Sequence, residues 1–103
     1  MPKLNRAKDP ENLVDRELTH VPQAAVAAEG DGYKVTVSVG KNPHAMEIVH
    51  FIEYVEIFDD ETFLARQDMT ADSRPMAVFH LKQRPERLVA KARCNTHGEW
   101  TNP

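Results

Sequence analysis

Four histidines and one cysteine in this chain have side chains that commonly bind metal ions. They are His20, His44, His50, His97 and Cys94. Cys94 and His97 form a Cys-x-x-His pair, which can offer a thiolate and an imidazole to one ion from a tight turn. Taken alone, the pair is equally consistent with a small buried thiol beside a surface histidine. The three other histidines favour a metal site.

The number of candidate ligands indicates which metal this site would hold. Four imidazoles and one thiolate exceed the four ligands of a closed structural zinc site. A larger ligand set suits a metal that accepts five- or six-fold coordination, and imidazole is a good ligand for iron. The remaining coordination position would be open to a small molecule. We therefore expect an iron centre with a reaction site.

Other residues that attract attention have simpler interpretations. His80 lies within the strand-like segment Val78–Leu81 and is expected to be a structural or surface residue. Trp100 is expected to pack rather than to react. Glu53 and Glu56 are three residues apart, and on a strand this spacing directs them to opposite faces. They are expected to be solvated or paired charges.

The elements that would position the ligands are predicted to be strands. Turn signals recur at roughly the 8–12-residue spacing of a β-sandwich. Apolar and polar residues alternate through Tyr33–Val39, as a half-buried strand requires. The segment from His50 to Phe58 is apolar on both faces, as in a central strand. Further strands are predicted at Met76–Lys82 and Leu88–Cys94, with a weaker one at Phe63–Asp68.

The N-terminal region has one helical signal. Asp9 can cap a helix that has Pro10 at its first position, so a turn or two is expected there. The candidate ligands lie at predicted strand ends or in loops, where distant segments can converge at one end of a sandwich.

Length and composition predict a single domain over residues 1–103, with an N-terminal segment at 1–19 and the sandwich at 20–100. The net charge of −3 gives no general attraction for nucleic acid or an anionic membrane. No apolar run is long enough to span a bilayer, and the first residues lack the apolar core of a signal peptide. With one cysteine, no intrachain disulfide can form. We expect a cytoplasmic protein.

Several short motifs resemble the catalytic domain of superoxide reductases, the neelaredoxin and desulfoferrodoxin family. The resemblance runs in consistent order from about Asn5 to Trp100, and its most specific part is the final Cys-Asn-x-His-Gly-x-Trp. The segments that carry it are His20-Val21-Pro22, Val39-Gly40, Pro43-His44-Ala45-Met46-Glu47, His50-Phe51-Ile52-Glu53-Tyr54-Val55-Glu56 and Ala92-Arg93-Cys94-Asn95-Thr96-His97-Gly98-Glu99-Trp100.

The resemblance implies an all-β, immunoglobulin-like antiparallel sandwich of about seven strands. It implies one iron per chain, cycling between Fe²⁺ and Fe³⁺, with His20, His44, His50 and His97 as equatorial ligands and Cys94 as the axial thiolate. Superoxide would bind opposite Cys94 and be reduced to hydrogen peroxide. A rubredoxin-like protein is the expected electron donor, and a homo-oligomer, a tetramer or dimer, is the expected assembly. With one cysteine, the additional four-cysteine iron domain of some members is not expected.

The chain departs from the family pattern before the first histidine. Many members have Glu-Lys there, and the lysine supplies positive charge that attracts superoxide. Here the two positions are Leu18 and Thr19, and the nearest acid, Glu17, is displaced by one residue. We expect Lys41, in preference to Arg16, to supply the steering charge.

Thr19, in place of the lysine, could hold a water at the site. The family proline after the second histidine is also replaced, by Ala45, which removes no ligand.

The alternative function is a non-catalytic immunoglobulin-like module with a structural metal, or a sulfur-carrier-like interaction module. Similar sandwiches serve such roles, and fold alone does not decide function. The missing lysine favours this alternative. The presence of all five candidate ligands argues against it, because a structural site does not need an open coordination position.

Overall fold

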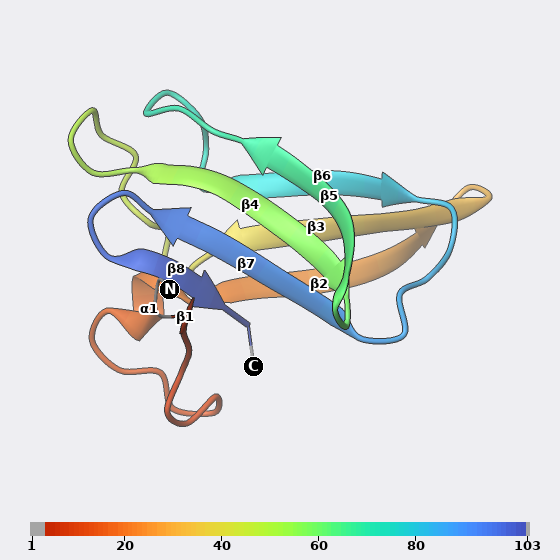
Figure 1. Cartoon of the computed structure of the whole chain (residues 1–103), viewed down its shortest axis with the longest axis horizontal. Helices are drawn as coiled ribbons and strands as arrows, with labels where there is room; N and C mark the ends of the chain where they lie inside the picture. Colours follow the sequence, from red (N-terminus) through yellow and green to blue (C-terminus); the bar gives the residue numbers. More distant parts are fainter. Residues whose placement is uncertain (1–3, 103) are drawn as a thin grey trace.

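Short strands form two facing sheets in the computed structural model, which describes residues 4–102. The two sheets lie one over the other as a sandwich (Figure 1). The elements in chain order are β1 (Leu4–Asn5), α1 (Glu17–His20), β2 (Pro22–Glu29), β3 (Gly32–Val39), β4 (Ile52–Asp59), β5 (Thr62–Asp68), β6 (Met76–Leu81), β7 (Leu88–Cys94) and β8 (Gly98–Thr101).

The larger sheet has the strand order β1-β8-β7-β4-β5, and the smaller sheet has the order β2-β3-β6. All neighbouring strands are antiparallel except β1 and β8, which run parallel. This architecture confirms the predicted all-β sandwich. Two short strands add to those expected: β1 lies within the predicted irregular N-terminal segment, and β8 follows the final motif.

The alternation seen in the sequence of β3 places one set of side chains between the sheets. Val35, Val37 and Val39 are each at most 1% exposed, whereas the residues between them are only partly buried. Ile52 and Ile57 of β4, in the other sheet, belong to the same core and are equally buried. Full burial of such a side chain contributes roughly 1.5–3 kcal/mol. This core holds the sheets that carry the candidate ligands.

One local prediction, the helical turn after Asp9, is only partly confirmed by the structure. Asp9 does cap a turn, because its backbone oxygen accepts from Asn12 and its side chain accepts from the Glu11 amide, but this turn does not continue into a helix. The helix that forms is α1. Among residues 4–102, no helix has the length and apolar character needed to cross a bilayer.

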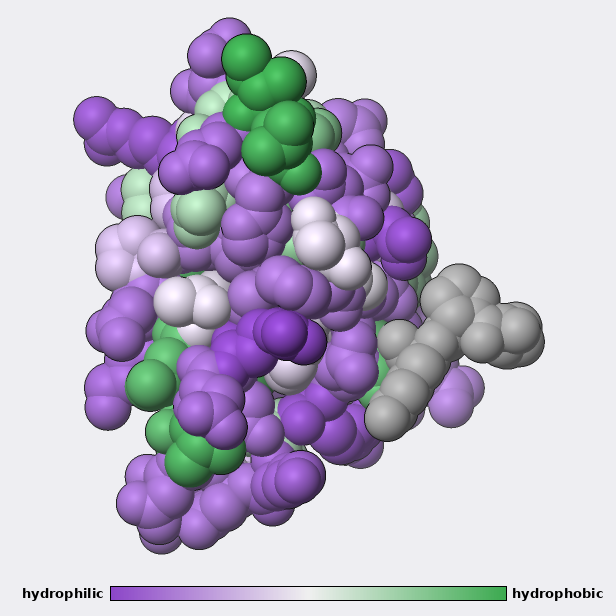
Figure 2. Space-filling view, turned by 90° about the vertical axis from the view of Figure 1, so that its left-hand side faces the viewer, coloured by the Kyte–Doolittle hydropathy of each residue, from purple (hydrophilic) through white to green (hydrophobic). Residues whose placement is uncertain are grey.

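One end of the sandwich gathers the loops that carry the candidate ligands. Helix α1, the β3–β4 loop and the β7–β8 turn all lie at the left-hand end of Figure 1. The β3–β4 loop exposes Ile48 and Val49, at 87% and 77%. Viewed end-on, this side of the molecule is largely hydrophilic with a few apolar patches (Figure 2). The prediction that strand ends and loops converge here is confirmed.

Candidate metal centre

Four of the five candidate ligands form one cluster. The ligand atoms of His20, His44, His50 and Cys94 all lie within 4.8 Å of one another. They come from α1, from two places in the β3–β4 loop and from the end of β7. His20, His44 and Cys94 are buried, and His50 is half-buried. The cluster therefore draws on segments far apart in the sequence.

The single turn of helix α1 orients His20. Its Nδ1 atom lies 2.8 Å from the carbonyl oxygen of Arg16, four residues earlier, at the start of α1. A carbonyl can only accept a hydrogen bond, so Nδ1 carries the ring proton in this contact. The Nε2 lone pair of His20 is then free and points into the cluster.

A backbone carbonyl orients His44 in the same way. Its Nδ1 donates to the oxygen of Ala45 at 2.6 Å, and its Nε2 lies 3.1 Å from Nε2 of His20. With both protons on Nδ1, two lone pairs face each other across 3.1 Å. Lone pairs repel, so this arrangement needs a proton or a cation between them. Convergent imidazole lone pairs of this kind are typical of a metal site.

The ring of His50 supplies a second indication of a missing partner. Its Nε2 atom is buried, and among the described residues no hydrogen-bond partner reaches it. Buried polar atoms are nearly always paired, and exceptions call for an ion, a water or a functional role. A ring nitrogen of His50 lies in the same cluster as the Cys94 thiol. A transition metal bound there would pair both atoms.

His97, the fifth candidate, lies at the edge of the cluster. Its Nδ1 is 3.1 Å from Nε2 of His20 and 3.9 Å from the sulfur of Cys94. Its backbone oxygen accepts from the indole N–H of Trp100 at 3.1 Å and from the Asn5 amide at 3.4 Å. This ring therefore presents Nδ1 to the site, whereas His20 and His44 present Nε2.

Burial disfavours the protonated form of three of the imidazoles by lowering their pKa values. It lowers the pKa of His20 to about 4, against the opposing effect of the Arg16 carbonyl, and nearby histidines lower this pKa further. Burial is also the main cause that lowers the pKa of His44 and of His97. The positive charge of Arg16 adds to the lowering at His97. A neutral imidazole is the form that binds metals.

Thr19, which stands in place of the family lysine, and the neighbouring acid Glu17 have other contacts. The Thr19 hydroxyl lies 2.9 Å from Nδ1 of His20, which is the ring nitrogen turned away from the cluster. The buried Glu17 carboxylate accepts from the backbone amides of Lys8 and Val14, at 3.3 and 3.1 Å. Glu17 thus organises the N-terminal loop, and its carboxylate is engaged there.

Lys41 is exposed, and its backbone lies against α1. On one side the Asn42 amide donates to the oxygen of Leu18 at 2.9 Å. On the other side Gly40 approaches Thr19 so closely that an added Cβ atom would lie 2.6 Å from the Thr19 Cα. The loop therefore brings Lys41 beside the position where the lysine is missing.

The residues set aside in the sequence analysis are not among the clustered ligands. His80 is exposed, with Nδ1 3.0 Å from the Glu29 carboxylate. Glu53 pairs with Arg93 at 3.1 Å, and Glu56 pairs with an arginine of β5 at 3.4 Å. Trp100 is buried, with its ring centre 5.1 Å from that of His20. These interpretations as surface, paired and packing residues are confirmed.

Sequence reasoning missed the groups that orient the imidazoles. The carbonyls of Arg16 and Ala45 fix the tautomers of two histidines, and the Asn5 amide helps to hold the backbone of His97. Backbone acceptors leave no mark in the choice of side chain, so no sequence signal could have revealed them. The donor set itself fits a transition metal, because one soft thiolate and several imidazoles suit iron, zinc or copper.

Comparisons with known proteins agree with this geometry. The desulfoferrodoxin family model matches residues 12–103. A desulfoferrodoxin homolog of Archaeoglobus fulgidus is 38% identical over 79% of this chain, and the chain spans 59% of the length of that relative. A superoxide reductase of Pyrococcus abyssi is 37% identical, with 81% of this chain and 83% of the relative covered.

A solved structure extends the agreement to the fold. The superoxide reductase from Nanoarchaeum equitans has a TM-score of 0.74 to this chain at 25% identity, with 97% of this chain and 96% of that one covered. The match therefore includes both sheets and the loops at the cluster end. The chain belongs to the desulfoferrodoxin family of superoxide reductases.

Proposed function

We propose that the protein is a superoxide reductase, which reduces superoxide to hydrogen peroxide at a mononuclear non-haem iron. The observation that carries the proposal is the convergence of imidazole lone pairs and one thiol from α1, the β3–β4 loop and the end of β7, with a buried ring nitrogen of His50 to which none of the described residues is hydrogen-bonded. Family membership supports the same activity. One electron and two protons are consumed for each superoxide.

In this proposal each ligand has a defined role. His20 and His44 would hold the iron through Nε2, His50 through a ring nitrogen, and His97 through Nδ1, the atom it turns toward the cluster. Cys94 would hold the iron through its thiolate, which would donate electron density to the metal. One iron per chain, alternating between Fe²⁺ and Fe³⁺, would supply the electron for superoxide.

The chain's own charges draw the anionic substrate inward. The protein carries a net charge of −3, so a local positive field has to oppose the overall repulsion. Arg16 supports this role because its charge acts on His97. Lys41 supports it because its backbone lies beside α1 at the position of the missing lysine. We propose that both contribute.

The proposal includes an external electron donor, because the printed sequence has ligands for one centre. A rubredoxin-like protein would serve, and a homo-oligomer, a tetramer or dimer, would be the working assembly. A cytoplasmic compartment suits the chemistry, because Cys94 has to remain a free, reduced thiol to bind metal.

The test is to purify the protein without oxygen, measure its metal content and record its visible spectrum before and after oxidation. Pulses of superoxide would then be given while hydrogen peroxide and oxygen are measured. We expect about one iron per chain, a thiolate-to-iron band on oxidation, and one peroxide per superoxide without oxygen release. Zinc or no metal, with no band after iron reconstitution, would favour the structural-metal module instead.

A further inference from the structure

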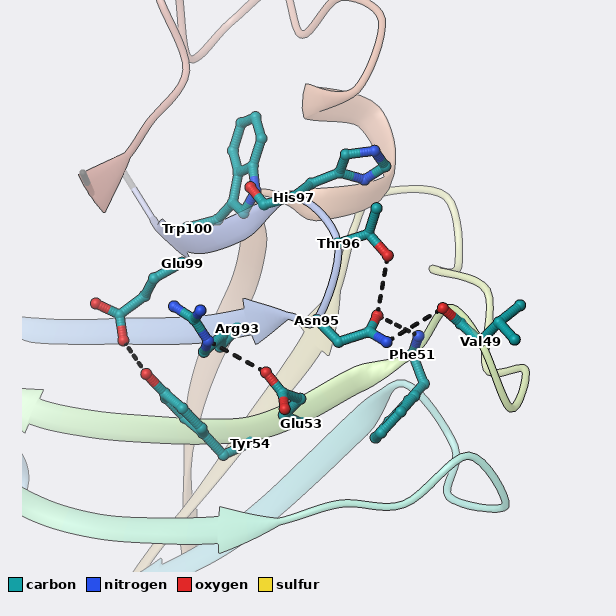
Figure 3. Close-up of polar contacts among 10 residues, drawn as sticks. All are labelled: Val49, Phe51, Glu53, Tyr54, Arg93, Asn95, Thr96, His97, Glu99 and Trp100. Atoms are coloured by element: carbon teal, nitrogen blue, oxygen red, sulfur yellow. Dashed lines mark hydrogen bonds and ion pairs between the residues drawn. The ribbon is translucent and has the colours of Figure 1, made fainter. Parts of the chain in front are cut away.

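The asparagine that follows Cys94 joins the two ligand-bearing segments of the larger sheet (Figure 3). The Asn95 side chain accepts from the Phe51 amide at 3.0 Å and donates to the Val49 oxygen at 3.1 Å. Its own backbone amide donates to the Phe51 oxygen at 3.1 Å. These three bonds bracket His50, because they engage the residue before it and the residue after it.

This bracket matters because it adds to the two backbone hydrogen bonds between His50 and Glu47, at 3.0 and 2.9 Å, and because the ring of His50 lacks a hydrogen bond of its own among the described residues. Among residues 4–102, no carbonyl fixes its ring in the way that Arg16 and Ala45 fix the other two imidazoles. The preceding residues Ile48 and Val49 are highly exposed, so packing does not hold them. The His50 ring is therefore positioned through its backbone. Glu47 holds that backbone within the β3–β4 loop, and the side-chain amide of Asn95 ties the residues on both sides of it to the end of β7.

We propose that Asn95 is a positioning residue: its side-chain amide fixes the distance between His50 and Cys94, and so sets the geometry of the metal site. The inference rests on the proposed function only in that the cluster binds a metal. Partners that orient metal ligands typically change affinity about 10–100-fold when they are removed.

A second asparagine repeats the same arrangement away from the cluster. Asn102 accepts from the Ala90 amide at 2.9 Å, donates to the Leu88 oxygen at 3.2 Å, and its backbone amide donates to the Ala90 oxygen at 3.1 Å. It thus brackets Val89, which is no ligand, with the pattern that Asn95 applies to His50. Asn102 is a matched control for the general effect of losing such a bracket.

The experiment compares Asn95→Ala with Asn102→Ala in the full chain, using Co²⁺ as the probe. Co²⁺ is titrated into metal-free protein, and its affinity and thiolate-to-cobalt band are recorded. We expect Asn95→Ala to weaken Co²⁺ binding about 10–100-fold and to shift the band. Asn102→Ala should stay within about 2-fold of the original protein with an unchanged band. Equal affinities and bands in the two variants would overturn the positioning role.

Amide hydrogen exchange of the metal-free protein tests the bracket itself. The Phe51 amide donates a hydrogen bond to the Asn95 side-chain oxygen. Its hydrogen should therefore exchange faster in Asn95→Ala and stay protected in Asn102→Ala. If Phe51 keeps its protection in Asn95→Ala, the inference is wrong whatever the metal does. Asn95→Asp keeps the acceptor and loses the donor to Val49, so it should give an intermediate loss of Co²⁺ affinity.

The original protein separates this inference from the proposed function. If it binds Co²⁺ through Cys94 but shows no superoxide consumption when loaded with iron, the proposed activity fails and the Asn95 comparison still stands. If it does not bind Co²⁺ at all, the metal site itself is wrong, and the positioning role is overturned with it.

Discussion

At the scale of single residues, the chemistry follows from where the ring protons are held. His20 and His44 each donate a hydrogen bond from Nδ1–H to a backbone carbonyl. Their Nε2 lone pairs therefore face each other across 3.1 Å. The thiol of Cys94 completes the group at less than 1% exposure. Imidazole lone pairs and a thiol that face one another form a suitable site for a metal cation. A metal that bound there would displace the thiol proton.

The axial role of Cys94 is tested by Cys94→Ser. Because a serine hydroxyl is a much poorer donor to iron than a thiolate, we expect the thiolate-to-iron band to disappear and most superoxide reduction to be lost. Absorption and stopped-flow measurements on the iron-reconstituted variant check this. Circular dichroism provides the control, since the sandwich should remain folded. A variant that kept both the band and the activity would contradict the axial assignment.

Steering by the two cations is tested by Arg16→Gln and Lys41→Gln. Both changes remove a charge and keep much of the side-chain length, so we expect the second-order rate with superoxide to fall by about 3–10-fold at low ionic strength. The loss should shrink as salt is added, because exposed charges are screened. Pulse radiolysis at several salt concentrations measures it. His80→Gln, at an exposed site paired with Glu29, is the control and should leave the rate unchanged.

At the scale of elements, the β3–β4 loop sets the position of His44. The loop turns at Gly40, whose φ of +91° is in the left-handed region, and the His44 amide then donates to the Val39 oxygen at 3.0 Å. The close approach of Gly40 to Thr19 ties this loop to α1, which carries His20. A single glycine thus joins two ligand-bearing elements.

Gly40→Ala should break that junction. A residue with a side chain pays about 1–2 kcal/mol for left-handed backbone, and the overlap with Thr19 adds about 1–3 kcal/mol. We expect the free energy of unfolding to drop by about 2–5 kcal/mol in urea titration. Gly30→Ala is the control, because Gly30 also has a positive φ, of +57°, but has nothing within 4 Å of an added Cβ. Equal losses in the two variants would show that the contact with Thr19 does not matter.

At the scale of the whole molecule, the core and the metal cluster are largely separate. The buried core lies between the sheets, on residues such as Val35, Val55 and Ile57. Cys94, at the end of β7, belongs to both groups. The sandwich therefore has its own source of stability, to which a bound metal would add.

Removing the metal should lower the melting temperature without unfolding the protein. A ligand at 100 times its Kd stabilises the native state by about 2.7 kcal/mol. For a domain near 100 residues this corresponds to roughly 10–20 °C. Calorimetry of metal-free and iron-loaded protein measures the shift, and far-ultraviolet circular dichroism should be the same for both at 25 °C. An unfolded metal-free chain would mean that the core alone is insufficient.

The sequence by itself determined the class of fold and the identity of the candidate ligands. Strict alternation in Tyr33–Val39 can bury only one face of a strand, and β3 follows it closely. Histidine and cysteine are recognisable as metal ligands wherever they fall. The two shortest elements of the N-terminal region were less predictable. β1 forms through pairing with the distant strand β8, and α1 is a single turn, too short to show a helical pattern in the sequence.

Only the tertiary structure decided how those ligands are used. Which ring nitrogen of His20 or His44 faces the site depends on a carbonyl that backbone geometry supplies. The engagement of Glu17 with the N-terminal loop, and of Asn95 with the peptides around His50, likewise depends on atoms brought together by folding. Residue types determine which chemistry is possible. The distances between ligands arise from long-range contacts, and the tautomers arise from the course of the backbone beside each ring, neither of which a pattern of residue types encodes.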